Sequence, residues 1–143
     1  ALLSDDTEAM NEYMNQIAGN AFSYFDTGKR ASGKAEPERF YHGFVLGLMV
    51  DLADRYVITS NRESGFGRYD IMLEPKKENL DAILIEFKVF HPRRDNSLED
   101  TVQAALLQIE EKKYAQTLIA KGISEERIRK YGFAFKGKEV LVG

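Results

Sequence analysis

Two stretches of the sequence combine a strand-like pattern with charged residues that could do chemistry together. Residues 67–73 and 82–89 are rich in Ile, Leu, Phe and Tyr, yet they contain Asp70, Glu86 and Lys88. Successive side chains of a strand point to opposite faces, so a hairpin of the two stretches would place these three charges on one side of the sheet. Charged groups are rarely placed in a core without partners. The two acids and the lysine are therefore predicted to act together, either in an ion network or in a reactive site.

The rest of the chain supplies the elements that must position these groups. Apolar periodicity and turn residues predict both helices and strands outside the two central stretches. In chain order they are helices over about 7–25 and from 36 onward, a strand over 55–60, a helix over 97–121, a short helix over 124–130, and strands over 132–135 and 139–142. Together with the two central strands, this order predicts an α/β sandwich with a mixed central sheet.

The predicted helix over residues 97–121 carries a further candidate. Ser97 has the form of an N-cap, and Gly122 suits the position just after a helix end. Apolar residues cover more than one face of this helix, so we expect it to be largely enclosed. Gln108 lies between alanines on one face, where a buried glutamine must find hydrogen bonds. It is either a polar core residue or part of the site.

Composition indicates a single globular domain. The chain has 143 residues, of which 43% are hydrophobic and 30% charged, so it is long enough for one substantial core and does not have a disordered composition. It has no cysteine, which excludes a disulfide framework and a thiolate metal site and fits a cytoplasmic protein. No apolar run approaches the roughly 18 residues of a membrane span, so we expect no membrane partner.

The net charge bears on whether nucleic acid could be a partner. The formal net charge is −3, whereas phosphate binding depends mainly on lysine and arginine. A basic surface would therefore have to be local. Candidates are Arg62 and Arg68 near the first central strand, residues 91–94 after the second, and Lys112 with Lys113 on the later helix. The alternative for each cluster is ordinary solvated surface charge.

The charged residues of the central strands also belong to a longer signature. Asp70 on one strand is followed by acid-any-lysine, Glu86-Phe87-Lys88, on the next. The segments that agree with this signature are 38–44, 60–70, 85–88, 105–114 and 131–135. Together they resemble the PD-(D/E)XK nuclease superfamily, and within it the nuclease-like domain at the C-terminus of bacterial AAA-ATPase-like proteins. The resemblance covers residues 36–143.

The resemblance implies a restriction-endonuclease-like αβββαβ core over residues 36–143, and the predicted order of elements matches it. Residues 1–35 would then be an N-terminal helix and linker that follow an upstream ATPase-like domain of the same polypeptide. The first residues, Ala1-Leu2-Leu3, lack an initiator methionine, so the chain is expected to be a fragment or a processed product.

The resemblance further implies a divalent metal site. Asp70 and Glu86 would bind the ion through their carboxylates, Phe87 through its backbone carbonyl, and Glu38 as an outer or direct ligand. Because these ligands are all oxygen atoms, Mg²⁺ is the expected ion and Mn²⁺ its substitute. Lys88 would position or deprotonate the attacking water and offset charge at the phosphate. From the helical pattern alone, Glu38 is instead an acid that complements the positive end of its helix.

Further residues would orient the substrate. Gln108 is counted with the catalytic groups, because nucleases of this superfamily commonly carry a glutamine, or a glutamine with a tyrosine, on this helix. The substrate-binding candidates are His42, Arg62, Arg68, Lys112 and Tyr114. Tyr114 is six residues from Gln108 and would not share its face on a continuous helix, whereas Lys112 is one turn away. His42 is alternatively a boundary residue of its own helix.

The implied activity is metal-dependent hydrolysis of phosphodiester bonds in DNA, by the nuclease domain of a larger ATPase-like protein. Two alternatives stay open. One is a non-catalytic DNA- or protein-interaction module that retains the nuclease fold. The other is a structural ion network of Asp70, Glu86 and Lys88, which is seldom favoured for stability alone. The sequence also leaves open DNA against RNA, ends against interior sites, and the oligomeric state, including a homo-oligomer.

Overall fold

A mixed sheet of five strands organises the chain. The computed structural model describes residues 7–12, 14–15, 43, 47, 51–63, 68–136 and 139–143, with the backbone alone at residues 61–63 and 68–69. Its elements are β1 (Tyr56–Glu63), β2 (Arg68–Pro75), β3 (Ala82–Val89), α3 (Leu98–Glu111), α4 (Tyr114–Ala120), a 3₁₀ helix (Glu125–Arg127), β4 (Ile128–Lys136) and β5 (Glu139–Val142). Residues 7–12 and 14–15, here called the N-terminal helical segment, are helical.

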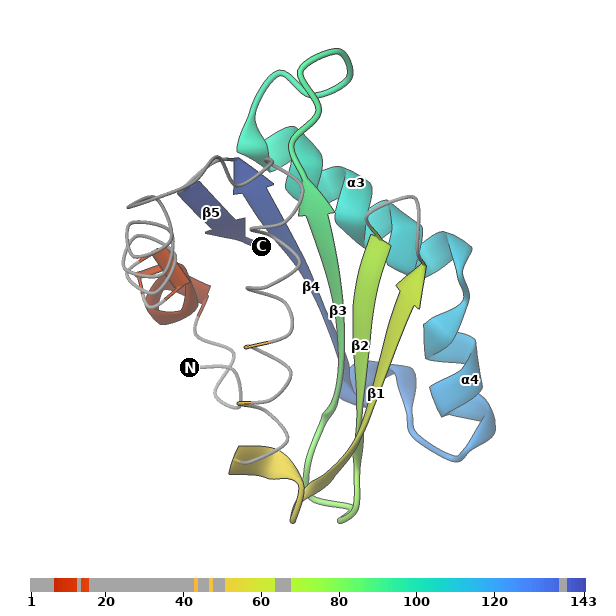
Figure 1. Ribbon diagram of the computed structural model, residues 1–143. Coiled ribbons are helices and arrows are strands. Elements are labelled where there is room, and N and C mark those ends of the chain that lie inside the picture. The colour runs from red at the N-terminus through yellow and green to blue at the C-terminus, as the bar shows by residue number, and fades with distance from the viewer. Residues whose placement is uncertain are drawn as a thin grey trace.

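The strands lie side by side in the order of the chain, β1-β2-β3-β4-β5. All neighbours pair antiparallel except β3 and β4, which are parallel and are connected through α3 and α4. Such a parallel pair needs a crossover connection, which is usually helical. Figure 1 shows α3 and α4 on one face of the sheet. The predicted α/β class with a mixed central sheet and flanking helices is confirmed.

Alternation along β3 divides the core between the two faces of the sheet. Ile83, Ile85 and Phe87 belong to a large buried cluster on the face away from α3. Ala82 and Leu84 belong to a second cluster, in which they meet Ile109 of α3 and Leu118 of α4. Because side chains alternate with period two, Glu86 and Lys88 share the face that α3 and α4 cover. The two helices therefore form one wall of any site at these residues.

A glycine in β4 lets α3 lie close to the sheet next to Glu86. Gly132 is the register partner of Glu86 on the parallel neighbouring strand. A Cβ at this position would lie 2.8 Å from the carbonyl oxygen of Val102 and 3.1 Å from the Cβ of Ala105, both in α3. The first distance is shorter than van der Waals contact allows, so a side chain here would push the helix away. The absence of a side chain at residue 132 thus allows α3 to lie close to β4, next to Glu86.

The prediction of one helix over residues 97–121 is wrong. The first helix ends at Glu111, Lys113 adopts the left-handed conformation (φ 56°, ψ 31°), and a second helix begins at Tyr114. Glycine or asparagine usually marks such a position, and a lysine gives no such signal. The prediction that this region is largely enclosed is also wrong in part, since Leu107 and Ile119 are 60% and 42% exposed.

The predicted short helix over residues 124–130 is wrong as well. Only the 3₁₀ turn Glu125–Arg127 forms, and β4 begins at Ile128, which pairs with Ala82 of β3. Pairing with a distant strand outweighs the local helix-start signal at Ser124, because strand formation depends on neighbours that are remote in sequence. The predicted strands over 82–89 and 139–142 have the observed bounds. Most of the helix predicted from residue 36 lies outside the described residues.

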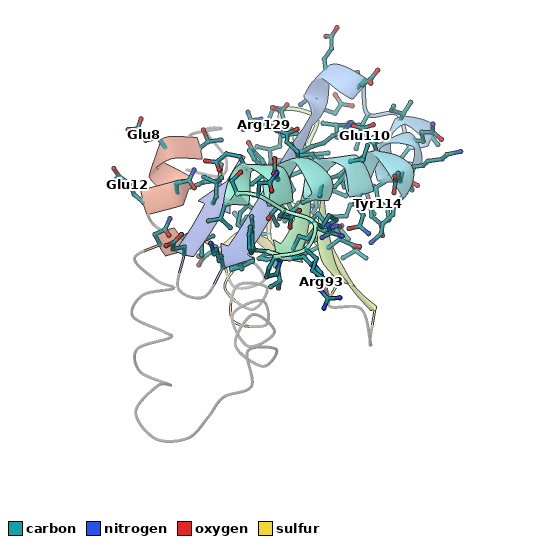
Figure 2. The ribbon with its side chains drawn as sticks, turned by 90° about the horizontal axis from the view of Figure 1, so that it is seen from above. Glu8, Glu12, Arg93, Glu110, Tyr114 and Arg129 are labelled. Carbon is teal, nitrogen blue, oxygen red and sulfur yellow. The ribbon has the colours of Figure 1, made fainter. Side chains whose placement is uncertain are left out.

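The N-terminal helical segment packs at the far side of the sheet from α4. Met10 and Met14 are buried in the large cluster, together with Val140 and Val142 of β5. Seen from above in Figure 2, α3 runs from the end where Glu8 and Glu12 lie towards Tyr114. Among the described residues, no helix is long and apolar enough to cross a lipid bilayer.

Two asparagines of the same segment cover the edge of the sheet at β5. Asn11 donates from Nδ2 to the carbonyl oxygen of Val142 (2.9 Å) and accepts from the N–H of Val142 at Oδ1 (2.7 Å). Asn15 makes the same pair of bonds with Val140, at 2.7 and 2.9 Å. The two amides are one helical turn apart and the two valines one strand repeat apart. Backbone groups of an edge strand, which otherwise attract other strands, are therefore satisfied within the chain.

We expect Asn11→Ala and Asn15→Ala each to lower the free energy of unfolding by about 1–2 kcal/mol, because each removes two hydrogen bonds from the sheet edge. Urea denaturation followed by circular dichroism measures the change. Glu12→Ala, at an exposed position of the same segment, is the control and is expected to change stability by less than about 0.5 kcal/mol. Equal effects at all three positions would contradict a specific contact with β5.

Candidate active site

Two buried carboxylates face each other at the centre of the sheet. Asp70 of β2 and Glu86 of β3 are direct partners in the antiparallel register, which brings side chains on one face into contact. Asp70 is 4% exposed and Glu86 is 0% exposed. Two like charges at such a position repel each other and have lost their hydration. The pair therefore requires positive charge or hydrogen-bond donors from the elements that cover it.

Lys112 and Tyr114 supply these donors from the junction of α3 and α4. The Nζ of Lys112 lies 2.9 Å from Oδ2 of Asp70 and 3.6 Å from Oε1 of Glu86, so one ammonium contacts both acids. The hydroxyl of Tyr114 donates to the same Asp70 oxygen at 2.9 Å. The left-handed residue Lys113 stands between them, and the change of chain direction there allows both side chains to reach Asp70. A continuous helix would have turned Tyr114 elsewhere.

Burial and these neighbours shift the protonation of the three groups. Burial, with the charge of Asp70, raises the pKa of Glu86 to about 7, although the charges of Lys112 and Lys88 act in the opposite direction. Burial and the hydrogen bond to Asp70 raise the pKa of Tyr114 to about 12, so its hydroxyl stays a donor. Burial alone would lower the pKa of Lys112, but the hydrogen bond to Asp70 and the charge of Glu86 outweigh it and raise that pKa. Lys112 is therefore an ammonium at neutral pH.

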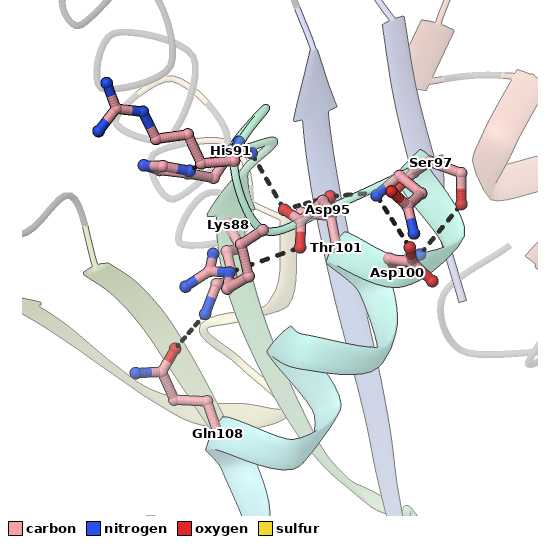
Figure 3. A network of polar contacts seen from close by, with 10 residues as sticks. Lys88, His91, Asp95, Ser97, Asp100, Thr101 and Gln108 are labelled. Atoms are coloured by element: carbon pink, nitrogen blue, oxygen red, sulfur yellow. Dashed lines mark hydrogen bonds and ion pairs between the residues drawn. The ribbon is translucent and has the colours of Figure 1, made fainter.

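Lys88 lies on the same face of β3 and contacts α3. Its Nζ donates to Oε1 of Gln108 at 3.4 Å, as Figure 3 shows. Gln108 is 7% exposed, and this contact is one of the hydrogen bonds that a buried glutamine requires. Lys88 is half-buried. The alternation of the strand thus brings both acids and this lysine to the face under α3, as the sequence predicts, and Gln108 joins them there.

The loop after β3 is fastened by a buried aspartate that the sequence pattern did not single out. Asp95, 4% exposed, accepts at Oδ2 from the N–H of His91 and from the hydroxyl of Thr101, both at 3.0 Å (Figure 3). Burial would raise the pKa of Asp95, but these two donors and Arg94 outweigh it and lower that pKa. The loop carries exposed Arg93 and Arg94. The sequence feature that could have indicated this contact is an aspartate six residues before a threonine at the start of a predicted helix.

The structure does not describe the side chains of four predicted site residues. Glu38 and His42 lie outside the described residues. The backbones of Arg62 and Arg68 lie at the end of the β1–β2 hairpin next to Asp70, where Arg62 pairs with Tyr69 and Arg68 with Glu63. The described side chains near the two acids are those of Lys88, Gln108, Lys112 and Tyr114.

Asp70 and Glu86 alone do not make up a complete set of metal ligands. Within the part of the chain that the structure describes, no group of three or more His, Cys, Asp or Glu side chains converges. The side chain of Phe87 points to the opposite face, where its ring lies 5.1 Å from Phe133 and 5.5 Å from Phe135. A third protein ligand would therefore come from the backbone or from residues that the structure does not describe.

A family model described as the PD-(D/E)XK nuclease superfamily matches residues 36–143, which include both acids, Lys88, Gln108, Lys112 and Tyr114. No curated protein matches the chain.

The free energy of unfolding is expected to depend on pH because Glu86 is buried. Its pKa rises from 4.5 to about 7 on folding, so the unfolded chain releases this proton at lower pH than the folded one. Stability therefore falls as the pH rises from about 4.5 to about 7, by roughly 3 kcal/mol from this group. Glu86→Gln removes the titration, so its free energy of unfolding should decrease less than that of the wild type between about pH 5 and pH 8.

Urea denaturation at the two pH values, in EDTA, measures this difference. Glu111→Gln, at an exposed position at the end of α3, is the control and should keep the pH dependence of the wild type. The burial argument would be wrong if Glu86→Gln and Glu111→Gln lost the same amount of stability with pH.

Proposed function

This chain belongs to the PD-(D/E)XK nuclease superfamily, and from this premise we propose that it hydrolyses phosphodiester bonds of DNA with the help of a divalent metal ion. The observation that carries the proposal is the position of Asp70 and Glu86. They are buried side by side on adjacent strands, with Lys88 on the same face. This is the arrangement of the acid and acid-any-lysine signature that the family shares.

The described residues suit a hard divalent ion. The two carboxylates of Asp70 and Glu86 offer oxygen ligands, which Mg²⁺ and Mn²⁺ prefer. Both acids already contact a single cation, the ammonium of Lys112, so their oxygens converge on one position. The backbone carbonyl of Phe87 and the carboxylate of Glu38 are the proposed further ligands. When bound, the ion would supply an activated water and neutralise charge on the phosphate.

The chain's own residues would do the rest of the chemistry. As an ammonium, Lys88 would hold the attacking water and stabilise charge in the transition state; as a neutral amine, it would instead take the proton of that water. Gln108 would act as a positioning residue, because its Oε1 accepts from the Lys88 ammonium. Tyr114 would keep Asp70 in place through its hydroxyl. Burial of the acids excludes water and strengthens these interactions.

DNA would approach from the end of β3 and the β1–β2 hairpin. Arg62, Arg68 and His42 are proposed phosphate contacts, and the exposed loop residues Arg93 and Arg94 extend the basic surface near Lys88. Such contacts would make binding strongly dependent on salt. In the bacterial AAA-ATPase-like proteins that the sequence resembles, a domain of this kind stands at the C-terminus. We therefore propose an ATPase-like domain of the same polypeptide as a partner.

One observation favours a second function, a non-catalytic interaction module that retains the fold. Lys112 contacts both acids, so their charge is compensated without a metal ion. In that case the protein would bind DNA or another protein and cleave nothing.

Cleavage by variants of Lys88 separates the two functions. Purified protein, freed of metal with EDTA and supplied with Mg²⁺ or Mn²⁺, is incubated with plasmid, linear and single-stranded DNA. We expect cleavage by the wild type and a loss of about 100-fold or more in Lys88→Ala, because a proton-transfer or charge-stabilising group is removed. Gel electrophoresis measures the rate, and thermal unfolding shows that the variant is folded.

Lys77→Ala, which removes an exposed lysine from the β2–β3 loop, is the matched control and should cleave like the wild type. A wild type that binds DNA in fluorescence anisotropy but leaves every substrate intact with both ions would exclude the nuclease and support the interaction module. Undiminished cleavage by Lys88→Ala would remove Lys88 from the mechanism.

A further inference from the structure

The ammonium of Lys112 lies between one oxygen of Asp70 and one oxygen of Glu86, and a divalent ion bound to these same two oxygens would take its place. Its Nζ is 2.9 Å from Oδ2 of Asp70 and 3.6 Å from Oε1 of Glu86. Mg²⁺ binds carboxylate oxygens at roughly 2.1 Å, so the ion and the ammonium cannot both stand between the same two oxygens. Their charges would also repel each other strongly in a buried position.

We propose that Lys112 is a tethered cation that occupies the metal position and must withdraw when a divalent ion binds. The inference rests on the proposed metal site at Asp70 and Glu86. In the metal-free protein Lys112 compensates the buried acids and keeps the sheet stable. On metal binding, one cation replaces another, so the affinity for the ion is reduced by the free energy of the Lys112 contacts.

The position of Lys112 in the chain allows such a withdrawal. It is the C-cap residue of α3, next to the left-handed Lys113, and its side chain is 16% exposed, so the ammonium has access to solvent. The lysine stem is long and flexible. Tyr114 holds Asp70 through a separate hydrogen bond and need not move. The acids thus stay in place while the cation between them changes.

The same arrangement explains why the cation comes from a helix end and not from the sheet. Lys88, on β3 itself, contacts Gln108 and has its backbone fixed by pairing with Ala134 of β4. Lys112 is attached at the junction between two helices, outside the sheet. A lysine at a helix end can leave the acids without disturbing strand pairing.

Chemical labelling of the wild type tests the withdrawal directly. The protein is treated briefly with an amine-acetylating reagent, in EDTA or with saturating Mn²⁺, and labelling of Lys112 is measured by mass spectrometry. We expect Mn²⁺ to increase the labelling rate of Lys112 several-fold, because the amine leaves its two carboxylates. The exposed neighbour Lys113 is the internal reference and should be labelled equally in both conditions.

Affinity for Mn²⁺ alone, measured by calorimetry, gives the second readout. Lys112→Met should bind Mn²⁺ at least about 10-fold more tightly than the wild type, whereas Lys113→Met, with the same loss of charge, should not. The melting temperature of Lys112→Met in EDTA should be lower than that of the wild type, and Mn²⁺ should restore it. If this variant does not fold, the labelling of the wild type decides alone.

The outcomes separate this inference from the proposed function. If Mn²⁺ binds to the wild type and binding is lost in Asp70→Asn, but the labelling of Lys112 is unchanged, the tethered-cation role is wrong and the metal site stands. If neither the wild type nor Lys112→Met binds Mn²⁺, both the role and the metal site are wrong.

Discussion

The repulsion between two buried carboxylates is the constraint on which the centre of this molecule depends. Asp70 and Glu86 are register partners on adjacent strands, so their backbones cannot move apart without breaking the sheet. Burial, and to a smaller extent the charge of Asp70, raises the pKa of Glu86 to about 7, and Asp70 accepts hydrogen bonds from two donors at a single oxygen. Each element packed over this face either compensates the charge or permits the compensation. The elements around the pair therefore reduce the free-energy cost of burying two carboxylates.

The arrangement of α3 and α4 brings positive charge and hydrogen-bond donors to the acid pair. Gly132 leaves room for α3 to lie close to the sheet, so that Gln108 and Lys112 reach it from the same helix. The helix then stops at Glu111, and the left-handed Lys113 redirects the chain so that Tyr114 also reaches Asp70. A left-handed conformation costs a lysine free energy, and at this position it accompanies the contacts of both neighbours with the acid pair. The break in the helix is therefore part of the site.

Much of the central arrangement follows from the sequence alone. Period-two alternation places Asp70, Glu86 and Lys88 on one face, and the bounds of β3 and β5 agree with the apolar runs. The helix break does not follow, because Lys113 carries no turn signal and its conformation depends on contacts with a strand about 40 residues earlier in the chain. The early start of β4 also involves a distant part of the chain, since Ile128 pairs with Ala82 of β3.

The sequence also did not predict the contacts of side chains with distant parts of the backbone. The four hydrogen bonds between the two asparagines, Asn11 and Asn15, and β5 join residues more than 120 positions apart. An asparagine in a helix gives no indication of its partner. Asp95 is similar, because an aspartate in a polar loop is usually exposed. Local patterns predict which residues can share a face, whereas these contacts depend on how the whole chain closes.

The two lysines of the site differ in how they contact the acid pair. A purely structural acid pair needs one cation, and Lys112 already contacts both acids. Lys88 adds a second positive charge beside Glu86, which lowers the pKa of Glu86 less than Lys112 does. Half-burying another ammonium costs free energy, and the buried Gln108 accepts a hydrogen bond from it. If the proposed hydrolysis takes place at this site, the phosphate would require a positive charge next to the acids, and Lys88 is placed to supply it.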